Sequence, residues 1–281
     1  MARMFTSTQL CRRPRRTFIA SPNMKKLIIA NWKMNPESLE EARTLVSSIE
    51  HRMSAVSNHT EVVVCPPFLY IAPFMHHTHE IRVGVQNLSW LEKGPLTGEI
   101  SAKQLKEWNV QYAILGHSER RLYLGETDSV VNLKILAALK HKITPIVCLG
   151  GDEGAKKEDM KTLVTKQFAA CTKDLDKRQL EKIVFVYEPV WAISTMSKSE
   201  PATGEHANEL IGHIYDLLEH RLGKIARTVR VLYGGTVNKN NVSEYAKFPQ
   251  IDGALVGAAS LDAENFWHVI NEFNREAIHK A

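Results

Sequence analysis

The 281-residue sequence lacks long hydrophobic runs, paired cysteines and clustered metal ligands. No apolar stretch approaches the ~18 residues that span a bilayer, so we expect no membrane association. The four cysteines lack Cys-x-x-Cys spacing, which predicts reduced thiols rather than disulfides or a zinc site. No group of His, Asp and Glu has the spacing of metal ligands, so we expect no metal and no cofactor.

Acidic residues are absent from positions 1–23, which carry five arginines. These arginines account for the whole net charge of +5, so residues 24–281 are formally neutral and a nucleic-acid partner is not expected. The segment has no secretory apolar core, but its Arg/Ser/Thr bias resembles an organellar transit peptide. Alternatively, Met24 is the natural start, and residues 1–23 are disordered or not translated. We expect a cytoplasmic protein, or an organellar one if the segment is a transit peptide.

Eight short runs of apolar, often β-branched residues alternate with amphipathic segments. Most runs are apolar throughout, as in parallel strands that are buried on both faces. Ser38, followed by Glu41, predicts a helix start, and Thr127 predicts another. The expected strands are 26–30, 61–65, 81–85, 112–115, 144–148, 183–187, 229–233 and 253–256, and the clearest helices are 38–52, 128–141 and 207–221.

This alternation predicts an α/β protein with a single (β/α)8 barrel over residues 24–281. No Gly/Ser-rich or Pro-rich linker divides the series, so we expect one domain. A doubly wound sheet is the alternative, but it would carry a glycine-rich fingerprint after its first strand. Asn31-Trp32-Lys33 stands there instead, which disfavours dinucleotide binding.

Three of the expected strands end at residues whose side chains can take part in catalysis. Lys33 follows the first strand, His117 the fourth and Glu188 the sixth. Side chains at the carboxyl ends of barrel strands share one face of the molecule. The sequence therefore predicts one site that contains a cation, an imidazole and a carboxylate.

The motifs at these ends resemble the triosephosphate isomerases from about Met24 to the C-terminus. Together they form a specific set, in the family's order: Asn-Trp-Lys-Met-Asn, Gly-His-Ser-Glu-Arg-Arg, Tyr-Glu-Pro-Val-Trp-Ala-Ile and Tyr-Gly-Gly-Thr-Val-Asn. The resemblance implies a TIM barrel that interconverts D-glyceraldehyde 3-phosphate and dihydroxyacetone phosphate in glycolysis and gluconeogenesis. Its substrate would be a small phosphorylated triose.

The expected chemistry agrees with that resemblance. Moving a carbonyl between adjacent carbons requires a base, and Glu188 in a pocket that excludes water suits this task. His117 would polarise the carbonyl, and a helix that begins at Ser118-Glu119 would keep its imidazole neutral. This family is itself the standard example of that pairing. Lys33 supplies a fixed positive charge, and by resemblance Asn31 orients the substrate and supports Lys33.

Phosphate binding is expected at backbone amides after the later strands. Gly234, Gly235 and Thr236 permit close approach after the seventh strand, next to Tyr233, and Gly257 and Ala258 do so after the eighth. The family commonly has Gly-Gly at the last pair, so the methyl group of Ala258 matters only if its φ must be positive.

The loop after the sixth strand departs further from the family. The family's lid usually reads Ala-Ile-Gly-Thr-Gly-Lys, whereas this chain has Ala-Ile-Ser-Thr-Met-Ser-Lys and a longer tip. Ser194 keeps the amide expected to touch the phosphate. Met196 restricts the backbone, so we expect altered lid kinetics with unchanged chemistry.

The segment 86–99 matches the family's protruding third loop in its length and its Thr-Gly-Glu ending. By resemblance Thr97 would enter a second subunit and brace Asn31 and Glu119 there. A free Ω-loop is the alternative, but it would leave Trp90 and Leu91 exposed. We therefore expect a homodimer that is formed through Gln86 to Glu99.

Two other functions are alternatives to the isomerisation of triose phosphates. Another phosphate-binding barrel, such as a sugar-phosphate isomerase of amino-acid biosynthesis, would need a different acid–base pair at the first and sixth strands. A non-catalytic barrel scaffold would be expected to lose Lys33, His117 or Glu188, and all three are present.

Overall fold

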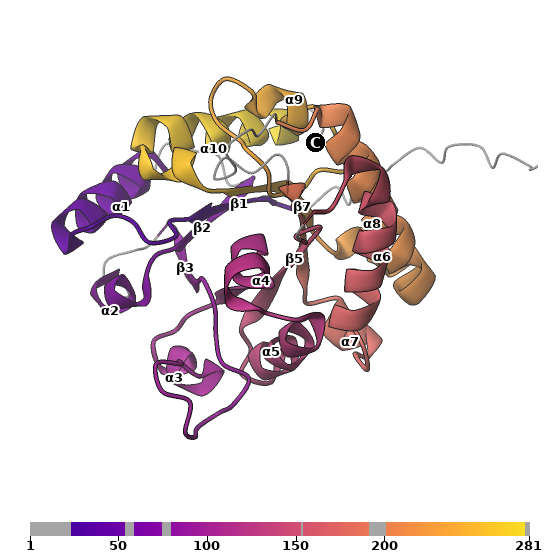
Figure 1. Cartoon of the computed structure of the whole chain (residues 1–281). Coiled ribbons are helices and arrows are strands. Elements are labelled where there is room, and N and C mark those ends of the chain that lie inside the picture. Colours follow the sequence, from indigo (N-terminus) through magenta and orange to yellow (C-terminus); the bar gives the residue numbers. More distant parts are fainter. Residues whose placement is uncertain (1–23, 54–58, 75–79, 153, 191–200, 279–281) are drawn as a thin grey trace, which may run out of the picture.

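The protein is a closed barrel of eight parallel strands surrounded by helices (Figure 1). The computed structural model describes residues 24–53, 59–74, 80–152, 154–190 and 201–278. Each strand pairs with the next along the chain, and β1 pairs with β8. The expected (β/α)8 architecture is confirmed. The strands are β1 Lys26–Asn31, β2 Thr60–Cys65, β3 Arg82–Val85, β4 Tyr112–Leu115, β5 Thr144–Leu149, β6 Val184–Tyr187, β7 Val231–Tyr233 and β8 Gly253–Val256.

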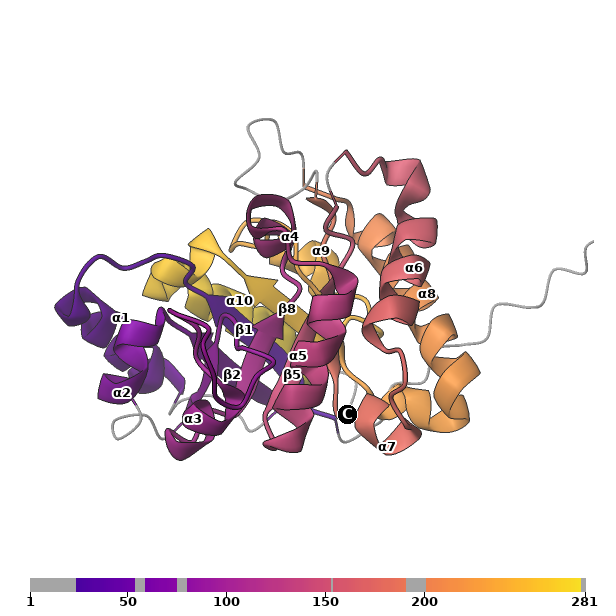
Figure 2. The same cartoon turned by 60° about the horizontal axis from the view of Figure 1, so that its bottom comes forward.

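The helices form an outer layer around the strands, and Figure 2 shows α5, α6 and α8 standing along the outside of the barrel. Short 3-10 turns complete several connections at Phe68–Tyr70, Lys157–Asp159, Gly223–Thr228 and Ala258–Leu261. The α-helices are α1 Leu39–Met53, α2 Ile71–Phe74, α3 Ala102–Glu107, α4 Ser118–Leu124, α5 Asp128–Lys140, α6 Met160–Cys171, α7 Lys177–Leu180, α8 Gly204–Leu222, α9 Val242–Ala246 and α10 Ala263–Ile278.

Two expected boundaries are wrong by two or three residues. Strand β7 begins at Val231 rather than at residue 229, because a 3-10 turn extends to Thr228. Helix α8 begins at Gly204 rather than at residue 207, because the Thr203 hydroxyl accepts the backbone hydrogen of His206 and caps the helix.

The expected caps of α1 and α5 are present. The Ser38 hydroxyl accepts the backbone hydrogen of Glu41, and the Thr127 hydroxyl accepts that of Val130.

Two apolar layers hold the barrel together. The interior is filled by side chains that include Leu27, Ile114 and Val186, while the alternate positions pack between the strands and the helices. Strands β1 and β8 approach very closely at Gly253. A Cβ atom there would lie 1.8 Å from the Leu27 carbonyl oxygen, and φ is +150°, so only glycine closes the barrel at this point.

Membrane-spanning helices are absent from the described residues, since none of their helices is both long enough and apolar enough. The carboxyl ends of the strands all open at one end of the barrel, because the strands are parallel. This arrangement gathers the residues that follow β1, β4, β6, β7 and β8 around one opening.

Candidate active site

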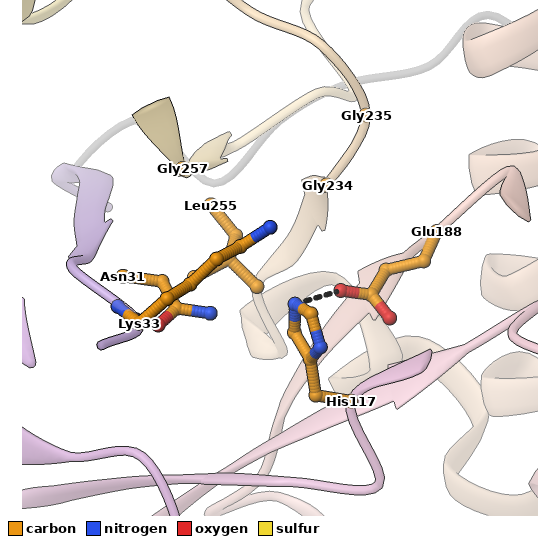
Figure 3. A pocket seen from close by; sticks show the side chains of 8 residues that line it. All are labelled: Asn31, Lys33, His117, Glu188, Gly234, Gly235, Leu255 and Gly257. Carbon is orange, nitrogen blue, oxygen red and sulfur yellow. Dashed lines mark hydrogen bonds and ion pairs between the residues drawn. The ribbon is translucent and has the colours of Figure 1, made fainter. Parts of the chain in front are cut away.

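The residues expected to carry the chemistry surround one hollow at the carboxyl ends of the strands. Figure 3 shows Lys33, His117 and Glu188 reaching toward it from three different strand ends. Leu255 on β8 is a barrel-interior residue that also lines this hollow. Among the described residues, the lining comprises Asn31, Lys33, His117, Glu188, Gly234, Gly235, Leu255 and Gly257.

His117 and Glu188 are in direct contact. The imidazole Nε2 lies 3.2 Å from one carboxylate oxygen of Glu188. The other ring nitrogen, Nδ1, accepts the backbone hydrogen of Glu119 at 3.2 Å, so it carries no proton. The imidazole is therefore neutral, with its proton on Nε2, the nitrogen nearer to Glu188. This orientation places a hydrogen-bond donor beside a carboxylate.

Glu188 is fully buried, and its two carboxylate oxygens differ: one lies beside His117 Nε2 without a completed hydrogen bond, and the other is hydrogen-bonded. The second oxygen accepts the backbone hydrogen of Ser118 at 2.9 Å. Ser118 is the first residue of α4, where unpaired amides and the helix dipole stabilise an anion. The N-terminus of α4 thus compensates a carboxylate that the barrel removes from water.

A thiol lies close to the same carboxylate. Burial and the neighbouring charge of Glu188 raise the pKa of Cys148 well above its ordinary value. Cys148 therefore stays a protonated thiol and does not add a second negative charge beside Glu188.

Lys33 is held in an unusual backbone conformation. Its φ is +53°, in the left-handed region that non-glycine residues seldom adopt. The Asn31 side chain accepts the Lys33 amide hydrogen at 3.1 Å, and the Gln86 side chain donates to the Lys33 carbonyl at 2.8 Å. The ammonium group pairs with Glu119 at 2.6 Å. Neighbouring side chains thus hold both the strained backbone and the charge.

The glycines after β7 allow close packing around Glu188. A Cβ atom on Gly234 would lie 2.5 Å from a Val186 methyl carbon and 3.0 Å from Cγ of Glu188. A Cβ atom on Gly235 would lie 2.1 Å from the hydroxyl of Tyr233. Tyr233 in turn stacks on another tyrosine of the outer layer, Tyr245, with ring centroids 4.3 Å apart.

Two expected phosphate ligands, Thr236 and Ala258, do not line the hollow. Thr236 is half-buried and its carbonyl accepts from Asn241, while Ala258 is exposed at the start of a 3-10 turn. Ala258 is not among the described residues with positive φ, so its methyl group causes no strain. Ser194 and the rest of the expected lid tip, 191–200, lie outside the described residues.

Sequence reasoning missed how several residues support the site. Gln86 was assigned only to the protruding loop, yet its side chain donates to the carbonyls of both Lys33 and Cys65. Leu255 and Cys148 were treated as strand residues. Their only signal was a position near a strand's carboxyl end, which every buried strand residue there shares.

The protruding segment 86–99 is tied to the chain that follows it and carries two partly exposed apolar side chains. Ser89 forms a bridge with Ser101, and the side chains of Trp90 and Leu91 are 36% and 38% exposed.

Within the described residues, no group of three His, Cys, Asp or Glu side chains is placed to hold a metal ion.

Comparison with known proteins identifies the family of this chain. The family model for triosephosphate isomerase matches residues 26–273. A triosephosphate isomerase of Moorella thermoacetica is 44% identical over 253 residues, covering 88% of this chain and 99% of the relative. One from Dehalococcoides mccartyi is 45% identical over 249 residues, covering 86% and 94%. One from Dictyoglomus thermophilum is 40% identical over 251 residues, covering 88% and 98%. The chain belongs to the triosephosphate isomerase family.

Proposed function

We propose that this chain interconverts D-glyceraldehyde 3-phosphate and dihydroxyacetone phosphate, with Glu188 as the base, His117 as the electrophile and Lys33 as the binding cation. The observation that carries the assignment is the contact between the neutral His117 Nε2–H and the buried Glu188 carboxylate, 3.2 Å apart in a hollow that Lys33 also lines. Family membership supports the reaction, and the geometry supports the proposed roles.

Glu188 would move one proton. Its carboxylate removes the proton from the carbon next to the substrate carbonyl, and the electrons form an enediolate. The same carboxylic acid returns a proton to the neighbouring carbon. His117 Nε2 donates its proton to one enediolate oxygen and recovers the hydroxyl proton of the other, which completes the isomerisation without any net change of atoms. Substrate must replace His117 as the neighbour of this carboxylate. The Glu188 carboxylate that is then free to react is already shielded from water.

His117 and Lys33 would stabilise the charge that develops on oxygen. The Nε2–H of a neutral imidazole donates to the carbonyl oxygen as it becomes an enediolate oxygen. The ammonium group of Lys33 offers a fixed positive charge to the dianionic substrate, and Asn31 holds the Lys33 backbone in place. Because Glu119 already pairs with Lys33, it keeps the ammonium group oriented before substrate arrives.

The phosphate would bind on the side of the hollow formed by β7 and β8. Gly235 and Gly257 lack side chains there, so their backbones are accessible to phosphate oxygens. We assign the amides of Thr236, Ala258 and Ser194 to the same group.

A coupled assay tests the proposal. Purified protein is supplied with D-glyceraldehyde 3-phosphate, and the dihydroxyacetone phosphate that forms is reduced by a second enzyme. We expect rapid turnover, and a loss of several orders of magnitude for Glu188→Gln with KM nearly unchanged. If Glu188→Gln retained more than about a tenth of the turnover, the role of the base would be wrong.

We also propose that the active form is a homodimer joined through residues 86–99. Exposed apolar side chains follow each of the first four strands, which are neighbours in the barrel, and they include Met34, Leu69, Leu91 and Tyr123. Met34 is 92% exposed and Leu69 83%. Exposed apolar side chains at four neighbouring strand ends fit a second copy of the chain, into whose site Thr97 would extend.

The remaining assignments follow from the sequence. We propose that residues 24–281 form the catalytic domain, separate from the basic segment 1–23, and that it works in the cytoplasm. Cys65, Cys148 and Cys171 are free and buried, which suits a reducing compartment. Mass spectrometry of the native N-terminus tests whether residues 1–23 are retained.

A further inference from the structure

Tyr187, the residue before the base, connects β6 to the helix layer. Val184 and Val186 of β6 face the barrel interior, whereas Tyr187 is fully buried between the strands and the helices. Its hydroxyl oxygen lies 3.0 Å from Nε2 of His206 on α8. Burial raises the pKa of Tyr187, so the hydroxyl keeps its proton and needs a partner in this dry layer.

His206 lies in the first turn of α8, and neighbouring elements fix this turn. The Thr203 hydroxyl accepts the His206 backbone hydrogen at 3.2 Å. Just before it, the Tyr245 hydroxyl of α9 donates to the Ala202 carbonyl at 2.8 Å. Gly204 packs so tightly on the backbone of α9 that a Cβ atom would lie 2.1 Å from a carbonyl oxygen. His206 is therefore attached to a rigid support.

The contact between Tyr187 and His206 joins the two ends of the connection from β6 to α8. From the sides, the backbone around Glu188 is held by two hydrogen bonds. The Glu188 amide donates to Leu149 on β5 at 2.7 Å, and the Gly234 amide donates to the Tyr187 carbonyl at 2.9 Å. His206 supplies the third support, from the outside of the barrel.

We infer that His206 is a positioning residue for this reaction, which holds the Glu188 backbone in place through the hydroxyl of Tyr187. The inference rests on the proposed role of Glu188. Without the contact, the buried hydroxyl of Tyr187 must find another partner, and its movement passes through one peptide bond to the base. Because proton transfer depends steeply on the alignment of base and carbon, a small shift lowers the rate.

The predicted signature is a loss of kcat with little change in KM. Lys33 and Gly257, two of the residues that we assign to substrate binding, follow β1 and β8 and lie outside the connection from β6 to α8. Misplacing Glu188 therefore affects the chemical step and leaves binding intact. A residue that only stabilised the fold would not separate the two constants in this way.

A double-mutant cycle tests the inference. Tyr187→Phe removes only the hydroxyl, and His206→Leu removes its partner. We expect each to lower kcat about tenfold with KM within about twofold, and the double variant to be no slower than the slower single variant. His206→Gln keeps a side-chain acceptor and should recover most of the kcat lost in His206→Leu.

His213→Leu is the matched control. His213 lies on the same helix, and its Nε2 is 2.8 Å from the Thr165 hydroxyl, away from Glu188. We expect its kcat to equal that of the unmodified chain. Wild-type kcat in Tyr187→Phe, additive losses in the double variant, or a Gln variant no faster than His206→Leu would each overturn the inference.

Glu188→Gln, assayed in parallel, separates this inference from the proposed function. If Glu188→Gln is inactive while Tyr187→Phe keeps full kcat, the positioning role alone fails. If Glu188→Gln is active, the assignment of the base fails instead.

Discussion

The proton of His117 is placed by a single backbone contact. Because the Glu119 amide donates to Nδ1, the ring offers Nε2–H to the hollow and needs no charge to act as a donor. Lys33, on the other side of the hollow, is also held by its neighbours. Asn31 and Gln86 hold it in a left-handed backbone conformation that lysine seldom adopts. Each reactive group is thus oriented by a neighbour on a rigid element.

Gly234 leads to a prediction at the scale of one residue. Gly234→Ala would place a methyl group 2.5 Å from Val186 and 3.0 Å from Cγ of Glu188. The methyl group must displace the base, so we expect kcat to fall about tenfold or more in the coupled assay. Gly212→Ala on α8 is the control, since its Cβ would be 3.4 Å from its nearest neighbour. Equal activity of the two variants would refute the steric argument.

A buried ion cluster connects three elements next to the site. Lys134 of α5 pairs with Glu126 and donates to Asn87 at 2.7 Å, while Arg120 of α4 approaches Glu126 at 3.3 Å. Lys134 and Glu126 are almost wholly buried. The cluster therefore ties the start of the protruding segment to the two helices that follow β4.

Lys134→Met should destabilise the fold by about 3 kcal/mol, because it leaves a buried carboxylate with less compensating charge. The measurement is the free energy of unfolding in urea at matched protein concentrations. Lys140→Met, on the same helix but in an exposed pair with Glu92, should leave the free energy unchanged within error. Finding both variants equally stable would show that the cluster contributes nothing to the fold.

His206 on α8 makes stability depend on pH. Burial, and then the charges of Lys157 and Lys161, lower its pKa below the ordinary 6.5, although Glu209 opposes them. As pH falls below about 6.5 the unfolded chain takes up this proton first, so stability decreases until the pH passes the lowered pKa of the folded state. The stabilising contribution is complete above about pH 6.5.

Urea unfolding at about pH 7.5 and 5.5 checks this linkage. The free energy of unfolding should fall more steeply with acidification in the unmodified chain than in His206→Gln, because glutamine does not titrate. Identical slopes would mean that His206 has the same proton affinity in both states.

At the scale of the whole molecule, we expect two copies of the chain to form a dimer. Leu69→Asp places a charge within the exposed apolar face and should shift the protein from dimer to monomer in sedimentation velocity, because burying that charge is unfavourable. Ile225→Asp is the control, since Ile225 is also exposed but precedes β7 at the opposite end of the barrel. A monomeric unmodified chain would contradict the dimer directly.

Most of the architecture was readable from the sequence. Parallel strands that are buried on both faces appear in the sequence as uninterrupted apolar runs. Polar residues at the carboxyl ends of these runs indicate the site. The positive φ of Lys33, the contacts of Gln86 and the bond between Tyr187 and His206 could not be read in this way. They depend on which distant segments meet once the barrel closes, and the sequence pattern carries no local signal for such contacts.

Isotope exchange tests the central claim most directly, because a base that holds the proton between two carbons exposes it to solvent. The reaction is run in D2O and the product examined by NMR. We predict deuterium on the carbon that receives the proton, and neither isomerisation nor exchange above background for Glu188→Gln. Isomerisation or exchange at the unmodified rate in Glu188→Gln would contradict proton transfer by Glu188.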